Sequence, residues 1–188
     1  MLMRDISFLY RVLFLISAIV ASPCYAELDS DDPDLGSFIE GAKWKEDNVI
    51  IPAFPRTEDL LKVEVDRADM PFSFYIDSKN LSVSNNDGIT RYTVVIESNS
   101  GAKNVLFEGI RCETTEFRTF AYGTYDNKLV KARTSKWTRI LNDGFMVHRY
   151  DFLRHYMCDE SQTSIPVKEV LRKIEYPEDF QGAGDESD

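Results

Sequence analysis

The chain has 188 residues, of which 43% are hydrophobic, and a formal net charge of −10 at pH 7. Its length fits one domain once a targeting segment is set aside, and its hydrophobic share is enough to bury an ordinary core. The charge lies at the ends: positions 27–40 hold six acids, positions 177–188 hold five, neither segment has a base, and positions 41–176 hold twenty of each. With acidic ends that repel phosphate and no basic stripe in the body, the sequence argues against a nucleic-acid partner.

The first 26 residues have the layout of a secretory signal peptide. Arg4 and Arg11 give a positive start, positions 12–20 (VLFLISAIV) are apolar and uncharged, and Ala26 is a small residue where cleavage would occur. The run is shorter than the roughly twenty residues that a membrane span needs, so it predicts export without a transmembrane span in the mature chain. A buried core helix is the alternative.

Cys24 leaves a second form of export open, because a cysteine just past an apolar run can be lipidated. Lipid-attachment signals have a small residue directly before that cysteine, and here it is Pro23. The sequence therefore favours cleavage near Ala26 and a soluble periplasmic protein over a lipid-anchored envelope form. The rest divides into an acidic flexible segment at 27–42, a folded domain at 43–176 and an acidic disordered tail at 177–188.

From position 61 onward, apolar residues recur at every second position, which is typical of strands with one buried face. The alternating residues are Leu61, Val63, Val65, then Phe72, Phe74, Ile76, then Tyr92, Val94, Ile96. Turn-forming residues separate these runs at 85–88, 98–101 and 126–127, and further strands are expected at 104–112, 117–124, 128–133 and around Trp137. Short strands joined by tight turns predict an antiparallel meander.

The period changes near the C-terminus, where 147–158 and 166–174 each predict a helix. A projection at about 100° per residue places Tyr150, Leu153 and Met157 on one apolar face of the first helix. The predicted fold class is therefore α+β: a single domain in which a curved antiparallel β-meander sheet is packed by one or two C-terminal helices.

Two cysteines, Cys112 and Cys158, remain after the predicted cleavage. A pair of cysteines in an exported domain most often forms a disulfide, which here would join a strand end to a helix end. A redox-active pair is the alternative, and the absence of CxxC spacing argues against it.

The two histidines form the pattern H-x-x-D-x-x-x-H with Asp151, which places His148, Asp151 and His155 on one helical face. Such spacing can hold a metal ion, but this face lies opposite the apolar residues of the same helix. We therefore expect a solvated face and no bound metal, with His148, Asp151 and His155 as weak metal candidates.

Charged residues interrupt two apolar strands at Arg91, Glu108 and Arg111. A carboxylate between two guanidiniums could contact a polar ligand or a partner, and the alternative is a cross-strand ion pair that fixes the register. Gly109 suggests a β-bulge beside them. Later strands are rich in aromatic residues; most are expected in the core, and Tyr122 and Trp137 are candidates for a ligand groove.

Positions 87–112 (DGITRYTVVIESNSGAKNVLFEGIRC) carry a DG turn, an RY-led apolar strand, an SGA-N hairpin and an EGIRC end. This series resembles the signature of the cryptic neisserial protein-like family of exported bacterial proteins, and the resemblance extends over about 44–158. It implies a shared domain and a location in the envelope of a Gram-negative bacterium, but it implies no activity because the family is uncharacterised.

No nucleophile elbow, phosphate loop or dinucleotide-binding fingerprint is present in the sequence, so we expect neither an enzyme nor a cofactor. The predicted function is a periplasmic binding or assembly-support module that contacts an unknown envelope protein or a small ligand through its sheet surface. The alternative is a small enzyme or metal-binding protein that uses His148, Asp151 and His155.

We predict that the mature chain begins near Glu27, because a positive start, an apolar run and a small residue precede it in that order. Intact-mass measurement of the exported protein checks this expectation. A diacylglycerol-modified Cys24, or a retained N-terminal segment, would contradict it.

Overall fold

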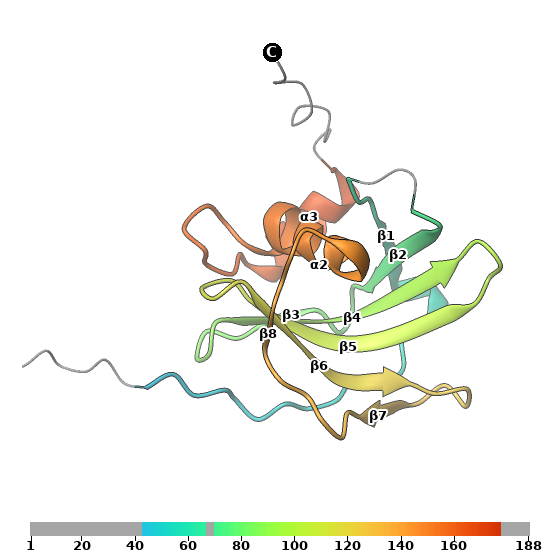
Figure 1. Cartoon of the computed structure of the whole chain (residues 1–188), viewed down its shortest axis with the longest axis horizontal. Helices are drawn as coiled ribbons and strands as arrows, with labels where there is room; N and C mark the ends of the chain where they lie inside the picture. The colour runs from blue at the N-terminus through green and yellow to red at the C-terminus, as the bar shows by residue number, and fades with distance from the viewer. Residues whose placement is uncertain (1–42, 67–69, 178–188) are drawn as a thin grey trace, which may run out of the picture. The chain divides into compact units, whose positions relative to one another are not determined.

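The computed structural model describes residues 43–66 and 70–177. The chain separates into two units, Met1–Lys43 and Trp44–Asp188, and the fold below belongs to the second. The predicted signal peptide at 1–26, the acidic segment at 27–42 and positions 178–188 of the predicted tail lie outside the description. The predicted fold class is confirmed: an antiparallel sheet is packed by short C-terminal helices (Figure 1).

The sheet follows the order β1-β2-β4-β5-β6-β7, with β3 paired to β4 and β8 paired to β6. Every pairing is antiparallel. The strands are β1 (Leu60–Val63), β2 (Phe72–Asp77), β3 (Ser82–Val83), β4 (Ile89–Ser98), β5 (Lys103–Arg111), β6 (Glu116–Gly123), β7 (Leu129–Lys131) and β8 (Thr138–Arg139). The predicted meander is therefore present, because short turns can join only antiparallel neighbours.

The turns lie where the sequence placed them, and residues that tolerate a left-handed backbone occupy them. Gly88 has φ +69° before β4, Gly101 has φ +83° between β4 and β5, and Asn127 has φ 56° between β6 and β7. Glycine and asparagine adopt these angles at low cost, so the local sequence sets the hairpin register.

The bulge in the sheet lies on β6, not at Gly109 as the sequence suggested. Phe107 faces Ala121 and Glu108 faces Thr119, so Phe120 is the extra residue. Gly109 makes room for it, because a Cβ at this position would lie 2.8 Å from Cε2 of Phe120 and 2.9 Å from Cγ2 of Ile89. The bulge turns Phe120 onto the same face as Phe107 and Ala121, where the three form a small second core.

The predicted first helix is two segments: α2 (Val147–Asp151) follows the short turn η2 (Gly144–Met146), and the π-helical stretch η3 (Phe152–Met157) follows α2. The second predicted helix is α3 (Val167–Glu175). In η3 the backbone N–H of Cys158 donates to the carbonyl of Leu153, 3.1 Å away and five residues back. This wider turn departs from the 3.6-residue period that a uniform helical projection assumes.

The prediction that the face with His148 and Asp151 is solvated is wrong, because His148 is 4% exposed and Asp151 is 2% exposed. The imidazole of His148 stacks on Phe74 with ring centroids 4.8 Å apart. A carboxylate oxygen of Asp151 accepts a hydrogen bond from the backbone N–H of Asp66 at 3.0 Å. Both polar side chains therefore have partners in the interior, and these partners allow them to be buried although they are polar.

One buried ion pair fixes α2 on the sheet. Glu108 of β5 is fully buried and accepts hydrogen bonds from Arg149 Nε at 2.9 Å and Arg149 Nη2 at 2.7 Å. Its oxygens also accept from the hydroxyls of Tyr92 (3.2 Å) and Thr119 (2.7 Å). Burial by itself would lower the pKa of Arg149, and the carboxylate of Glu108 more than offsets this, so the pKa is raised. The guanidinium also lies 4.2 Å from the Phe117 ring centre.

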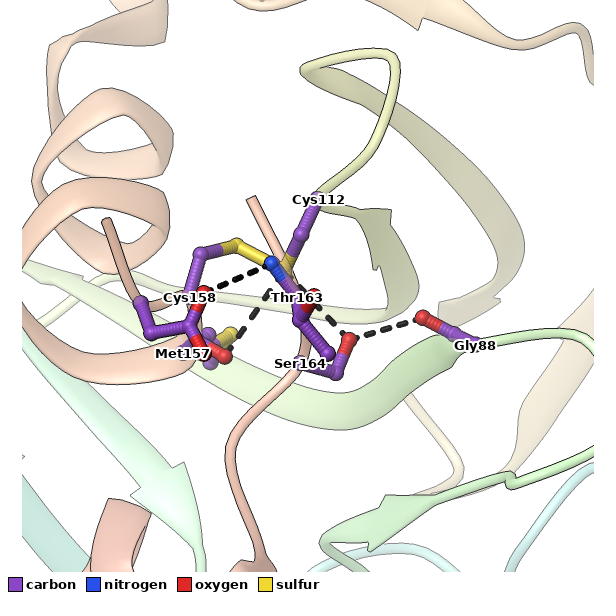
Figure 2. The surroundings of a disulfide bond; sticks show 7 residues. Gly88, Cys112, Met157, Cys158, Thr163 and Ser164 are labelled. Atoms are coloured by element: carbon purple, nitrogen blue, oxygen red, sulfur yellow. Dashed lines mark hydrogen bonds between the residues drawn. A yellow bond between two sulfur atoms is a disulfide. The ribbon is translucent and has the colours of Figure 1, made fainter. Parts of the chain in front are cut away.

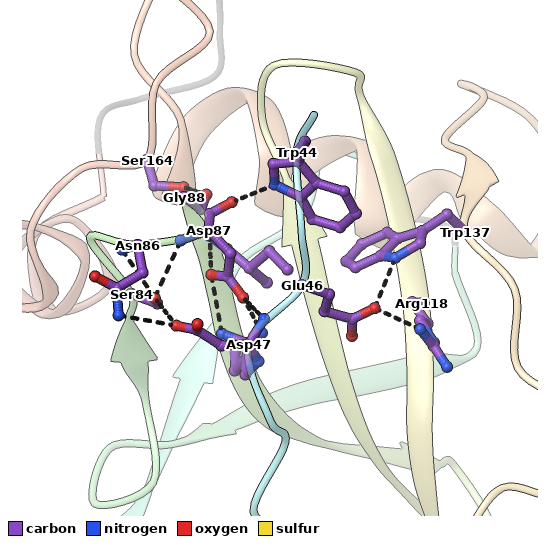
Figure 3. Close-up of polar contacts among 12 residues, drawn as sticks. Trp44, Glu46, Asp47, Ser84, Asn86, Asp87, Gly88, Arg118, Trp137 and Ser164 are labelled. Carbon is purple, nitrogen blue, oxygen red and sulfur yellow. Dashed lines mark hydrogen bonds and ion pairs between the residues drawn. The ribbon is translucent and has the colours of Figure 1, made fainter. Parts of the chain in front are cut away.

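An N-terminal strap, residues 44–56, packs against the opposite face of the sheet. Figure 3 shows how its polar groups converge on two points. Trp44 Nε1 donates to the carbonyl of Asp87 and the backbone N–H of Asp47 donates to the Asp87 carboxylate, both at 2.9 Å. Glu46 accepts from Arg118 at 2.5 Å and from Trp137 Nε1 at 3.2 Å.

The strap covers the second core, since Val49 and Ile51 pack on it. The sheet therefore has one face under the helices and the other under the strap.

We predict that Arg149→Met lowers the free energy of unfolding by about 3–5 kcal/mol, because it leaves the carboxylate of Glu108 buried without a counter-charge. Chemical denaturation measures the change. The double variant Glu108→Gln/Arg149→Met should recover a large part of the loss, since it removes both charges. Arg154→Met, an exposed arginine nearby, is the control and should change stability by less than about 0.5 kcal/mol. If Arg149→Met and Arg154→Met lowered the free energy of unfolding equally, the anchoring role of Arg149 would be contradicted.

Candidate functional site

An open cleft of about 1350 Å³ lies between η3, the segment 139–142 and the loop after Cys158. Apolar side chains from η3 and from the segment line it, with Leu141 47% exposed and Leu153 half-buried. Its charged lining residues are Arg139, Arg154 and Lys173 with Asp66, Asp159 and Glu160. The cleft thus offers apolar contact and mixed charge, which suits a peptide-like segment.

The disulfide predicted between Cys112 and Cys158 is confirmed and lies in the wall of this cleft. The Cα atoms of Cys112 and Cys158 are 5.7 Å apart, within the range that an unstrained disulfide needs. Cys112 directly follows β5 and Cys158 directly follows η3, so the bond ties the helical layer to the sheet (Figure 2).

The loop after Cys158 is held from both sides. Its ends form a β-bridge between Cys158 and Ser164, and the backbone N–H of Ile165 donates to the carbonyl of Met157 at 3.0 Å. The hydroxyl of Ser164 donates to the carbonyl of Gly88 at 2.7 Å and lies 3.3 Å from the sulfur of Cys112 (Figure 2). This loop therefore joins the disulfide to the turn that holds the strap.

The π-helical stretch brings two ring-bearing side chains to the cleft wall. The hydroxyl of Tyr156 donates to the carbonyl of Glu64 at 2.8 Å, and burial raises the pKa of Tyr156. Burial also lowers the pKa of His155 by more than the nearby carboxylate of Asp151 raises it, which favours the neutral imidazole. Lys173 of α3 donates to the backbone carbonyl of His155 at 3.2 Å, and this hydrogen bond ties α3 to η3 beside the cleft.

The predicted group of Arg91, Glu108 and Arg111 does not come together. Arg91 faces Gly109 in the register while Tyr92 faces Glu108, so Arg91 and Glu108 project from opposite faces of the sheet.

Each of the three residues has another partner. Arg91 pairs with Asp87 at 2.5 Å, Glu108 pairs with Arg149, and Arg111 pairs with Glu113 at 2.6 Å and stacks on Trp44 at 4.1 Å. Burial would raise the pKa of Asp87, and its hydrogen bonds from Arg91 and two backbone N–H groups lower it overall. These interactions hold the structure together.

The aromatic candidates also separate. Tyr122 projects from the helix-bearing face of β6 and is 47% exposed, whereas Trp137 is half-buried against Phe120 on the strap face. Neither residue lines the cleft.

Of the three weak metal candidates, only His155 lines the cleft; His148 and Asp151 lie in the interior. Within 43–66 and 70–177, no three His, Cys, Asp or Glu side chains are grouped as metal ligands would be. In the same part of the chain, no helix has the length and hydropathy to cross a bilayer.

Sequence reasoning missed most of the site. Nothing in the sequence pattern linked Arg149 to Glu108 or Ser164 to Gly88, because each pair joins residues distant in the chain. Nothing indicated that Leu141 lines a cleft, because the cleft is formed by several distant segments. Only the disulfide had a sequence signal, since the two cysteines had no other partner.

We predict that the double variant Cys112→Ser/Cys158→Ser loses about 3–4 kcal/mol of unfolding free energy in the chain-entropy model, because the bond closes a loop of 46 residues. Denaturant titration measures the loss. Hydrogen exchange should show that residues 152–165 lose protection before the β4–β5 hairpin does. Two reactive thiols in the native parent protein, or uniform loss of protection in the variant, would contradict the role assigned to this bond.

The model of the CNP1-like family matches residues 39–175, a range that runs from before the strap to the end of α3. Comparisons with curated proteins and with solved structures gave no significant match. The matched range covers well over half of the chain and includes the stretch 87–112 that carried the resemblance. The chain therefore belongs to the CNP1-like family.

Proposed function

We propose that this protein is a periplasmic, non-enzymatic binding or assembly-support module that holds a segment of an envelope protein in the cleft beside η3. Export is supported by the signal-peptide pattern at 1–26 and by the disulfide, which persists in oxidising compartments such as the periplasm. The binding role replaces the sheet surface expected from the sequence, since both sheet faces are largely covered.

The observation that carries the proposal is a cleft with a fixed wall and an exposed rim. The disulfide, the Ser164–Gly88 hydrogen bond and the Lys173–His155 hydrogen bond fix the wall. Leu141 and Arg154 at the rim are exposed. Preorganised walls reduce the entropy that binding costs. At about 1350 Å³ the cleft exceeds the roughly 300–1,000 Å³ of small-molecule pockets, which favours a peptide segment.

The arrangement of titratable groups favours binding over catalysis. The buried carboxylates Glu108 and Asp87 are engaged in ion pairs away from the cleft. General acid–base catalysis needs a poised group within reach of a substrate. The alternative built on His148, Asp151 and His155 has less support, because two of these residues lie in the interior.

We predict that photo-crosslinking residues placed at Leu141 and Arg154 in the producing cell each trap the same adduct, because both positions border the cleft. The same probe at Ile50 and Lys168, which are exposed but do not line the cleft, is the matched control. Mass spectrometry identifies the adduct, and osmotic shock should release the protein with the periplasmic fraction.

Leu141→Asp/Arg154→Glu should then weaken binding of the identified partner at least tenfold, a change of about 1.4 kcal/mol. Ile50→Asp/Lys168→Glu should leave it unchanged. The proposal fails if the control positions trap the same adduct, or if the cleft variant binds as well as the parent protein.

A further inference from the structure

A second surface lies at the β6 side of the sheet and differs from the cleft in its charge. Between Asp126 and Asp143 the chain carries no acid, but it carries five bases: Lys128, Lys131, Arg133, Lys136 and Arg139. The balanced charge of positions 41–176 concealed this concentration, so the expectation that the body has no basic stripe is wrong.

The topology places these bases along one edge. Both β7 and β8 pair with β6, so residues 129–139 run beside β6 as the outermost part of the sheet (Figure 1). We name this stretch, with Lys128, the basic edge. All five of its bases are exposed.

Most of these charges are not neutralised. Lys128 pairs with Asp126 at 2.5 Å. For Lys131, Arg133 and Lys136, no carboxylate of the described chain lies within ion-pair distance. Glu116 lies opposite Arg139 in the register, but among the described residues no ion pair joins the two side chains. The edge is therefore a positive surface on a protein of net negative charge.

Exposed aromatic and apolar side chains accompany the bases. Tyr122 and Val130 are cross-strand partners on one face and are 47% and 53% exposed. Tyr125 projects fully from the turn that joins β6 to β7. Tyrosine rings favour the headgroup level of a bilayer, where one side of the ring is apolar and the hydroxyl is hydrated.

We propose that the basic edge docks this protein on the surface of an anionic phospholipid bilayer. Lysine and arginine near such a surface are attracted to its negative potential, and the tyrosines supply contact at headgroup depth. Exposed charges on flexible side chains suit a flat, laterally mobile array of headgroups. The docking is peripheral, and of the five bases only Arg139 also lines the cleft.

The test compares binding of the full exported protein to vesicles containing phosphatidylglycerol and to pure phosphatidylcholine vesicles. Cosedimentation should show binding to the first kind alone, and high salt should release it. The variant Lys131→Glu/Arg133→Glu/Lys136→Glu should lower the partition coefficient by at least about 100-fold, because each lost cation contributed about a factor of five and each new carboxylate is repelled by the surface. Tyr125→Ser should lower it several-fold.

A matched control reverses three exposed lysines elsewhere, Lys45→Glu/Lys79→Glu/Lys168→Glu, with the same change in net charge. It should bind like the parent protein, and so should the cleft variant Leu141→Asp/Arg154→Glu, which separates this proposal from the cleft function. Circular dichroism verifies that each variant folds. Equal loss in the edge and control variants, or equal binding to both vesicle types, would overturn the proposal. Binding of the parent to a polyglutamate resin but not to vesicles would assign the edge to an acidic protein and overturn the lipid docking.

Discussion

The helical layer depends on one buried carboxylate. Glu108 lies in the middle of β5 with no exposure, and an isolated charge at such a place would be very costly. Arg149 supplies the counter-charge from α2, and Tyr92 and Thr119 satisfy the remaining oxygen positions. Through Arg149, α2 is held against Glu108 of β5 and Phe117 of β6. The stretch η3, which follows α2 directly and is itself followed by Cys158, lines the cleft.

The disulfide and the Asp87 turn extend this constraint to the other side of the sheet. The bond joins η3 to the end of β5, Ser164 joins the following loop to Gly88, and Asp87 holds Trp44 and Asp47 of the strap. One chain of contacts thus runs from the cleft wall to the strap. Loosening the disulfide would therefore affect both faces of the sheet, although the central β4–β5 hairpin has its own backbone ladder.

The charged residues of this protein fall into two groups, those paired in the interior and those exposed on the basic edge. Those in the interior, such as Glu108 with Arg149 and Asp87 with Arg91, are paired and add geometric specificity more than net stability, since desolvation offsets much of their attraction. Those on the basic edge face solvent. The border is positive because five bases fall between Asp126 and Asp143 with no acid among them, while the acids that balance them lie elsewhere in the body.

The sequence by itself determined the elements whose causes are local. Alternation at Phe72, Phe74 and Ile76 indicated a strand, Gly88 and Gly101 located turns, and Cys112 and Cys158 indicated the disulfide because no other pairing remained. These features require only neighbouring residues or simple elimination. The family resemblance at 87–112 added membership but no chemistry.

Only the tertiary structure decided which charges meet. Arg91 and Glu108 lie close in the predicted hairpin, yet the register sends them to opposite faces. The polarity of His148 and Asp151 indicated solvent, but Phe74 and the backbone of Asp66 give them interior partners. The bases at 128–139 lie along one edge of the sheet because β7 and β8 both pair with β6. Burial and pairing depend on segments distant in the chain, and a residue's own type and spacing carry no record of them.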